Sequence, residues 1–412
     1  MTAALFTVIL VVITALIFDF TNGFHDSANA VATAVATKAM SPRVAVVLAA
    51  VLNVTGAFLS TEVAKTISGG IVDDALVTPA IVFAGLVGAI LWNLVTWLLG
   101  LPSSSSHALF GGLIGAVLVG AGFAGVHFDV VVAKVLVPAV AAPLVAGLVA
   151  ALATRLGYWI SGRGDQKQMN VGFRYGQAVS SSLVALAHGT SDGQKTMGVI
   201  TLVLIVSGYQ ASGTGPAFWV VITAGLAIGL GTASGGWRIM RTLGHGLTSM
   251  APLQGFAAST ASTAAILSSA HMGFGLSTTQ VSTGAIVGAG LGRRGGKVSW
   301  KTARRMVWAW LVTLPAAAAV GAVAAFVIQI GTAGVVAMFV VLLLASLAIW
   351  LIARRNPVHA GNVGETEPPP LPTMPPAAPA ALVMPKKRKK KKKGKKKKGK
   401  KKGKNRSGPG TR

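Results

Sequence analysis

The sequence contains a long series of apolar stretches, most of them long enough to cross a lipid bilayer. A spanning helix needs about 20 mostly apolar residues, because each residue advances the helix by about 1.5 Å. The candidate stretches are 3–38, 43–61, 80–100, 108–126, 130–155, 172–208, 216–235, 252–270, 281–292, 306–328 and 332–353. A helix satisfies its own backbone polar groups, as a segment in lipid must. We therefore predict an all-α polytopic membrane protein with about 11 spans.

Composition supports this class and excludes several others. Hydrophobic residues make up 52% of the 412 residues and charged residues only 11%, whereas a soluble domain averages about 25% charged residues. The chain has no Cys, which excludes disulfides, thiolate metal sites and a Cys nucleophile. No basic segment precedes the first apolar run, so we expect a retained first span rather than a cleaved signal peptide.

Two polar motifs each occur twice, in the same order. Gly23–Asn29 aligns with Gly189–Lys195, and further along each half Ser104–His107 aligns with Ser277–Gln280. Recurrence of both motifs at similar spacing predicts two related transmembrane repeats, at residues 1–155 and 172–330. The first candidate span of each half is too long for one straight crossing and carries Gly and polar residues midway, so we expect both of these helices to be interrupted.

Charge predicts the orientation of the two repeats. Lys and Arg in short loops stay on the cytoplasmic side, and threading the spans through the basic clusters places the N-terminus outside and the C-terminus in the cytoplasm. The same threading puts the segment 102–107 on the inner side and 277–280 on the outer side. Inverted-topology repeats with interrupted helices are typical of secondary transporters whose site lies near the bilayer midplane.

The rest of the chain divides by composition. We predict a cytoplasmic connector at 156–171, an extra span at 331–355, a Pro- and Ala-rich linker at 356–385 and a disordered poly-Lys tail at 386–412. The tail holds 18 of the 37 Lys and Arg residues, and their mutual repulsion opposes folding. Anionic lipid would attract it by about 1 kcal/mol per charge, although nucleic acid or polyphosphate would serve equally well.

Asp26 and Asn29 lie three residues apart and therefore share one helix face. A carboxylate inside a membrane is costly unless it faces partners, water or an ion. Carboxylate and amide oxygens suit a hard cation or a transferred proton. The alternative is a buried carboxylate that only joins two helices by a hydrogen bond.

Asp192 and Lys195 are the equivalent pair in the second half, with an ammonium in place of the amide. Lys195 could neutralise Asp192, or it could offer a fixed positive charge to an anionic substrate. A purely structural ion pair is the alternative. Each of these interpretations disfavours a metal cation at this position, because the ammonium would repel it.

The segment after Leu101 begins with Pro102 and four Ser residues and opens a Gly-rich apolar helix. Pro and Ser are common at helix starts, where free N–H groups and the positive end of the helix dipole favour an oxyanion. Ser277, Thr278 and Thr279 repeat the pattern. We predict two re-entrant hairpins, with ordinary N-capping as the alternative reading.

Four histidines, His25, His107, His188 and His271, lie near these motifs in the sequence. Imidazole titrates in the range that a proton relay needs, but a single His is more often only a hydrogen-bond partner. Elsewhere Asn53, Asn93 and Thr96 are predicted to form hydrogen bonds between helices.

Three of these stretches resemble the inorganic phosphate transporter family, specifically its bacterial low-affinity, proton-coupled branch. They are residues 22–33, 101–107 and 187–195, and the resemblance extends from about residue 5 to 330. It implies uptake of phosphate across the plasma membrane, in some bacterial members as a neutral complex of phosphate with a divalent metal, accompanied by a proton.

The resemblance also implies which residues bind the cargo. Phosphate binding would fall to Ser104, Ser105, Ser106, Ser277, Thr278, Thr279 and Lys195, and coupling to protons or another cation would fall to Asp26, Asn29, Asp192, His25 and His107. A metal would be cargo rather than a resident ion, and no cofactor or enzymatic activity is expected. Dimer formation is left open.

This chain departs from the family pattern at informative positions. Sodium-coupled members resemble Gly-Ala-Asn-Asp-Val-Ala-Asn-Ala in both Asp motifs, whereas this chain has His25, Ser191 and Lys195. These departures favour protons over sodium. The two hairpins also differ, because Gln280 stands where the first has His107, so the two gates are expected to be unequal.

Several alternatives remain at this stage. The substrate could be sulfate or another tetrahedral oxyanion, and sodium could be the coupling ion. In a different functional class, the protein could be a membrane anchor whose poly-Lys tail binds polyanions. An intramembrane hydrolase is disfavoured, because the Ser and Asp motifs repeat symmetrically whereas a catalytic triad needs one asymmetric cluster.

Overall fold

The computed structural model describes residues 3–161 and 166–364, and in these residues the chain is helical apart from turns, loops and two isolated β-bridges. The all-α prediction is therefore confirmed for this part of the chain. The poly-Lys tail and most of the predicted linker lie outside the described residues.

The first half contains α1 (Ala3–Ala36), α2 (Pro42–Gly56), α3 (Glu62–Gly69), α4 (Pro79–Leu98), α5 (Ser105–Gly120), α6 (Phe128–Val131) and α7 (Val137–Ser161). The second half contains α8 (Gln166–Val206), α9 (Phe218–Ser234), α10 (Trp237–His245), α11 (Pro252–His271), α12 (Thr278–Gly292), α13 (Trp300–Ile328) and the final α14 (Thr332–Arg354). Most of these helices overlap the apolar stretches of the sequence, whereas α3 and α10 lie between predicted stretches.

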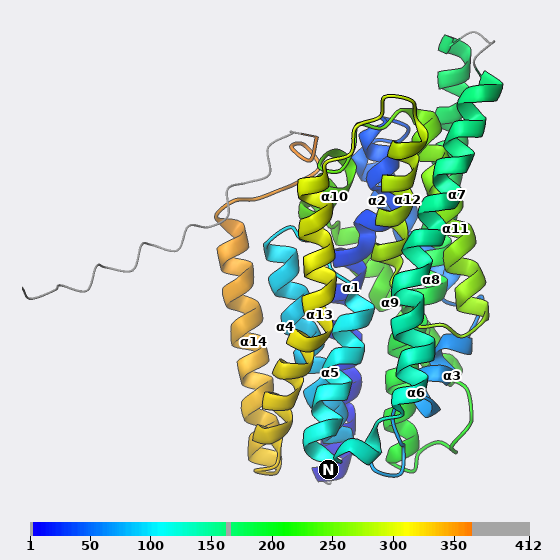
Figure 1. Cartoon of the computed structure of the whole chain (residues 1–412). Coiled ribbons are helices and arrows are strands. Elements are labelled where there is room, and N and C mark those ends of the chain that lie inside the picture. The colour runs from blue at the N-terminus through cyan, green and yellow to red at the C-terminus, as the bar shows by residue number, and fades with distance from the viewer. Residues whose placement is uncertain (1–2, 162–165, 365–412) are drawn as a thin grey trace, which may run out of the picture. The chain divides into compact units, whose positions relative to one another are not determined.

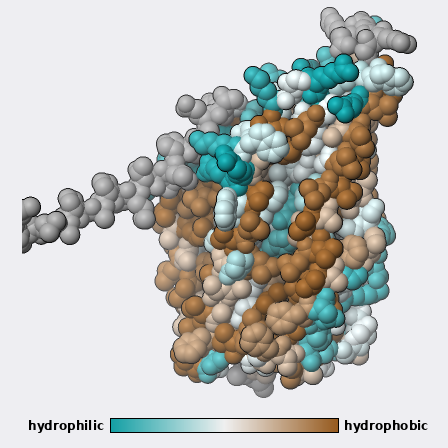
Figure 2. Space-filling view, in the orientation of Figure 1, coloured by the Kyte–Doolittle hydropathy of each residue, from teal (hydrophilic) through white to brown (hydrophobic). Residues whose placement is uncertain are grey.

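By length and hydropathy, five helices among the described residues could each cross a membrane, or six if the bent α9–α10 pair counts as one span. Large apolar side chains lie exposed along α7, α13 and α14, as in Leu148, Phe326 and Leu344. On the face shown in Figure 2, apolar side chains cover much of the surface, and hydrophilic ones gather at the upper end and along the lower right edge. The chain is therefore a multi-pass membrane protein, although fewer of its helices pass this test than the roughly 11 spans expected.

The two halves exchange packing partners. Helix α5 of the first half packs against α13 of the second, and α12 of the second packs against α7 of the first. Both contacts depend on glycine, because a Cβ at Gly115 would collide with a carbonyl of α13 and a Cβ at Gly288 with one of α7. Small residues are what allow membrane helices to approach so closely. The long helices α1 and α8 also contact each other near the middle of the bundle (Figure 1).

The predicted interruption of the two long helices is wrong. Helix α1 runs unbroken through Gly23, and α8 runs unbroken through Gly189. Each glycine instead faces a neighbouring backbone, Gly23 that of α9 and Gly189 that of α2, with no room for a Cβ at either position. The break occurs between α9 and α10, which are bent by 69° where Gly235 adopts a φ of +77°.

The two Ser/Thr motifs begin helices as predicted. Ser104 is the N-cap of α5 and accepts a hydrogen bond from the backbone N–H of His107, at 3.1 Å. Ser277 is the N-cap of α12 and accepts one from the N–H of Gln280, at 3.3 Å. In both cases a non-helical segment leads into the helix, so each helix N-terminus lies inside the protein rather than at its surface.

Candidate functional site

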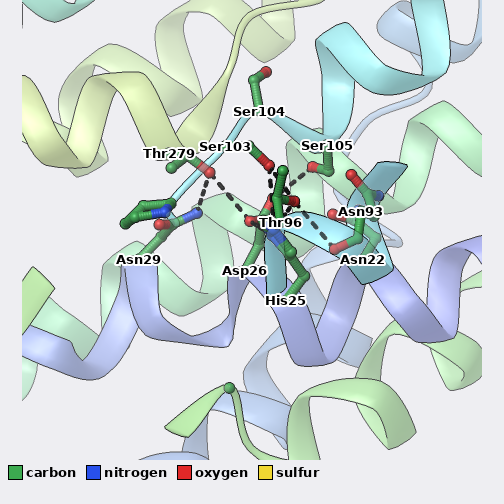
Figure 3. Close-up of polar contacts among 12 residues, drawn as sticks. Asn22, His25, Asp26, Asn29, Asn93, Thr96, Ser103, Ser104, Ser105 and Thr279 are labelled. Carbon is green, nitrogen blue, oxygen red and sulfur yellow. Dashed lines mark hydrogen bonds and ion pairs between the residues drawn. The ribbon is translucent and has the colours of Figure 1, made fainter. Parts of the chain in front are cut away.

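The carboxylate of Asp26 joins three helices. It accepts a hydrogen bond from the hydroxyl of Ser105 on α5 at 2.5 Å, and another from the hydroxyl of Thr279 on α12 at 3.1 Å (Figure 3). The amide of Asn29 donates to Thr279 at 2.9 Å. The first Asp motif therefore contacts both hairpins, and all four side chains are buried.

Asp192 forms the matching centre on α8. Its carboxylate lies 2.5 Å from the ammonium of Lys195, and it accepts hydrogen bonds from Thr278 at 3.3 Å and from the amide of Asn22 at 3.5 Å. Lys195 also donates to the hydroxyl of Ser106 at 2.5 Å. The predicted pairing of Lys195 with Asp192 is confirmed.

Neighbouring hydroxyls thus divide between the two carboxylates. Ser105 and Thr279 bind Asp26, whereas Ser106 and Thr278 bind the Asp192–Lys195 pair. The two hairpins also touch each other directly, because the Ser106 hydroxyl donates to the carbonyl of Leu276 at 3.0 Å. Motifs at least 79 residues apart in the sequence therefore assemble into one continuous polar site inside the helix bundle.

The site combines opposite charges without exposure to solvent. Asp26, Asp192 and Lys195 are all 0% exposed. A buried ammonium is tolerated only when it is paired and hydrogen-bonded, and Lys195 meets this requirement through Asp192 and Ser106. Because Lys195 is held by only these two groups, a substrate anion that displaced Ser106 would meet the ammonium directly.

His25 is attached to the first centre. Its Nδ1 atom lies 2.6 Å from Asp26, and its Nε2 atom lies 3.3 Å from the hydroxyls of both Thr96 and Ser103. Thr96 was expected to join helices and does so. Ser103 was not among the predicted binding residues, although it belongs to the same Ser run, and its contact with His25 depends on the turn before α5.

The other histidines have different surroundings. His188 bridges Asn53 on α2 and Asp192, with distances of 3.2 Å and 3.3 Å. Among the described residues, His107 forms no hydrogen bond with Asp26 or Asp192, and its Nδ1 atom lies 3.5 Å from the side-chain amide nitrogen of Gln280. Both His107 and Gln280 line an apolar groove of about 920 Å³ between α7, α12 and α13. His271 is exposed and bonds only within its own helix.

Two of the predicted phosphate-binding residues bond to the backbone of their own helix rather than to a carboxylate. Ser104 and Ser277 cap their helices, and in Figure 3 the Ser104 side chain points away from Asp26. Sequence reasoning gave too little weight to Asn22. The sequence places Asn22 directly before Gly23 of the first motif, but it gives no sign of the contact with Asp192, which is 170 positions away.

A cation could be held by the residues that both Asp motifs supply. One ligand atom from each of Asp26, His188 and Asp192 lies within 4.8 Å of the others. Carboxylate and imidazole ligands suit a divalent metal or a proton. The hydroxyls, the helix N-termini and Lys195 supply donors for an oxyanion. The arrangement is therefore suited to receive an anion and a cation together.

Comparison with known proteins assigns the chain to a family. Residues 22–321 match the phosphate transporter family. The chain belongs to this family. A relative from Mycobacterium tuberculosis, named "Probable low-affinity inorganic phosphate transporter", is 51% identical over 366 residues, covering 88% of each chain.

Further relatives have the same name. One from Rhizobium meliloti is 43% identical and covers 76% of this chain and 93% of its own, and one from Bacillus subtilis is 40% identical and covers 78% and 97%. A solved structure titled "The sodium-dependent phosphate transporter" has the same fold, with a TM-score of 0.67 over 79% of this chain and 99% of its own, at 23% identity. The family resemblance read from the motifs is confirmed, as is the assignment to transporters rather than enzymes.

Proposed function

We propose that this protein is a secondary active transporter that imports inorganic phosphate across the plasma membrane together with protons, by alternating access. The observation that carries the proposal is the meeting of both Asp motifs with both hairpin tips at one buried site. The names of the relatives support phosphate as the substrate.

Phosphate binds to donors at the start of the two hairpin helices. Ser105, Ser106, Thr278 and Thr279 supply hydroxyls, and Lys195 supplies a positive charge. Ser104 and Ser277 contribute by fixing the N-termini of α5 and α12, whose dipoles favour an anion. The anion replaces Ser106 beside Lys195, which leaves the ammonium paired on both sides.

The coupling ion binds on the carboxylate side of the same site, at Asp26, Asn29 and Asp192. His25 takes part through its contact with Asp26, at 2.6 Å. Lys195 lies within 2.5 Å of Asp192 and repels an added metal cation there, so protons are the favoured coupling ion. A divalent metal enters only as cargo in a neutral complex with phosphate, whose negative charge offsets the repulsion by Lys195, near Asp26, His188 and Asp192.

The two halves act as inverted repeats, with α5 and α12 as the helical arms of re-entrant hairpins. Their exchange of partners, α5 with α13 and α12 with α7, supports this relation. The N-terminus lies outside and the C-terminus in the cytoplasm. Opening toward one side separates the hairpin tips, whose direct hydrogen bonds among the described residues are those of Ser106 with Leu276 and of His107 with Gln280.

Uptake of labelled phosphate by cells that depend on this protein tests the proposal. We expect a protonophore to collapse uptake and sodium to have no effect on it. Excess sulfate should compete poorly. Uptake that resists the protonophore and requires sodium would overturn proton coupling, and full competition by sulfate would overturn the assignment of phosphate as the specific substrate.

A further inference from the structure

One buried acidic residue has no role in the site described so far. Asp19 lies on α1 about two turns before Asp26 and is 0% exposed. Neither oxygen of its carboxylate has a hydrogen-bond partner among the described residues. A carboxylate in a membrane interior without a hydrogen-bond donor carries a large desolvation cost, so this residue needs an explanation.

Two neighbouring side chains each have one polar atom without a hydrogen-bond partner. The polar groups that interact with Asp19 are Thr196 on α8 and Asn22 on its own helix, and neither forms a hydrogen bond of normal geometry with it. The Thr196 hydroxyl and the Asn22 carbonyl oxygen also lack partners, and both residues are 0% exposed. We call Asp19, Asn22 and Thr196 the Asp19 cluster.

Counting donors and acceptors shows what the cluster needs. Its atoms without a hydrogen-bond partner include three acceptor oxygens, two on Asp19 and one on Asn22, and the Thr196 hydroxyl is the one unpartnered atom that can donate. One added proton on Asp19 changes this balance. The acid can then donate to the Asn22 carbonyl while its other oxygen accepts from Thr196, so that every member gains a partner.

A metal ion fits the cluster poorly. Ions such as Ca²⁺ take six to eight oxygen ligands, more than the cluster provides. The charged groups that act on Asp19 are Asp192 and Lys195 of α8, and the Lys195 ammonium repels a metal. Helices α4, α9 and α12, which also pack against α1, carry no titratable side chain in their described lengths. The other helices that pack against α1 are α2, α5, α10 and α11, and they carry Arg43, His107, Arg238, Arg241, His245 and His271, none of which is among the groups that act on Asp19. A proton is the cation that a single carboxylate can hold.

The cluster is connected to the transport site. Asn22 interacts with Asp19, and its side-chain amide nitrogen donates to Asp192 at 3.5 Å. Asp26 lies near Asp192, whereas Asp19 lies near Thr196, so α1 and α8 run in opposite directions here. Asp19 is therefore displaced from the site toward the N-terminal end of α1, the outer side in the proposed topology.

We propose that Asp19 is a proton-binding site of the transporter, which takes up a proton from the outer side before phosphate binds. The proposal rests on proton-coupled phosphate transport and names a residue that carries the proton. Ionised Asp19 adds a negative charge beside the Asp192–Lys195 pair and opposes an incoming anion. Protonation removes that charge, so proton and phosphate favour each other's binding.

Proteoliposomes containing purified protein test the proposal with two assays. One measures accumulation of labelled phosphate driven by an imposed pH gradient, and the other measures exchange of labelled for unlabelled phosphate at equal pH on both sides. Asp19→Asn mimics the protonated acid, because its amide can donate to Asn22 and accept from Thr196. Exchange cycles only the loaded carrier, whereas accumulation requires the proton to leave.

We therefore expect Asp19→Asn to lose gradient-driven accumulation at least tenfold and to lose much less of its exchange. Thr14→Val is the matched control, because Thr14 is equally buried on α1 but bonds only to its own helix, at 2.8 Å to Leu10. It should behave as wild type in both assays. Accumulation by Asp19→Asn at the wild-type level would overturn the proposal, and so would equal loss of accumulation and exchange.

A third variant covers the case in which Asp19→Asn does not fold. Asp19→Glu keeps the acid but moves it, and we expect accumulation to persist with a shifted pH profile. An unshifted profile would contradict a proton site at this residue. Failure of the wild-type protein itself to accumulate phosphate under the pH gradient would instead contradict the proposed function, so the two failures are distinguishable.

Discussion

At the scale of single residues, the site depends on two carboxylates, each of which is linked to the N-terminal ends of both α5 and α12. Asp26 binds Ser105 and Thr279, and Asp192 binds Thr278 and, through Lys195, Ser106. This arrangement makes each carboxylate a link between the two halves of the protein. The negative charge of each carboxylate matters as much as its shape, because hydroxyl donors and neighbouring cationic groups surround it.

Asp26→Asn and Asp192→Asn should each abolish transport and leave the protein folded. Hydrogen bonds to a charged group are worth about 1.5–3 kcal/mol each, so losing two predicts at least a roughly hundredfold fall in phosphate uptake. Asp74→Asn is the matched control, because Asp74 is partly exposed and bonds only Ser212, at 2.6 Å. Wild-type uptake rates in either site variant would remove that residue from the site.

Lys195→Asn gives the second Asp motif the amide that Asn29 supplies at the matching position of the first. Removing the ammonium leaves Asp192 buried without its charge partner, a change that costs about 3–5 kcal/mol in comparable buried pairs. We expect lower thermal stability, partly restored by sodium, together with sodium stimulation of uptake. Melting curves and uptake in sodium against choline buffer measure both effects. If sodium acts on neither property, Lys195 does not stand in for a cation.

At the scale of helices, the N-capping Ser residues and the apolar stretches could be predicted from the sequence, because capping is a local effect and hydropathy is a property of composition. The position of the helix break could not. Gly23 and Gly189 lie midway along long helices and next to polar residues. Both are needed for close packing, Gly23 against α9 and Gly189 against α2. Gly has the same sequence signature in both roles, and only the neighbouring backbone distinguishes them.

Gly23→Ala tests this packing role. The added Cβ would collide with the backbone of Ile228 on α9, and overpacking of this kind costs about 1–3 kcal/mol. We expect a lower melting temperature in detergent and weaker transport. Gly172→Ala on α8 is the control, since nothing lies within 4 Å of its added Cβ and Ala favours a helix. Equal melting temperatures for the two variants would refute the close approach of α1 and α9.

At the scale of the whole molecule, the two halves depend on each other. Neither hairpin helix packs mainly within its own half, because α5 lies against α13 and α12 against α7. The sequence motifs predicted that the halves are related. The exchange of partners, however, joins residues as far apart as Gly115 and Ala318 or Gly147 and Gly288, and no local pattern encodes such contacts.

Deleting residues 386–412 should leave transport intact. The deletion removes 18 of the 37 Lys and Arg residues but none of the side chains at the site. We expect unchanged phosphate uptake per protein in the membrane and weaker binding of the isolated protein to anionic vesicles, at about 1 kcal/mol per charge. Loss of uptake at a normal membrane level would instead favour a protein that acts through its tail.

The most direct test of the central claim is accumulation of labelled phosphate in sodium-free proteoliposomes with the outside made acidic. We predict that phosphate accumulates above its equilibrium level only while the pH gradient lasts, that a protonophore releases it, and that excess sulfate scarcely reduces it. Uptake that ignores the pH gradient and begins only when sodium is added would contradict this account.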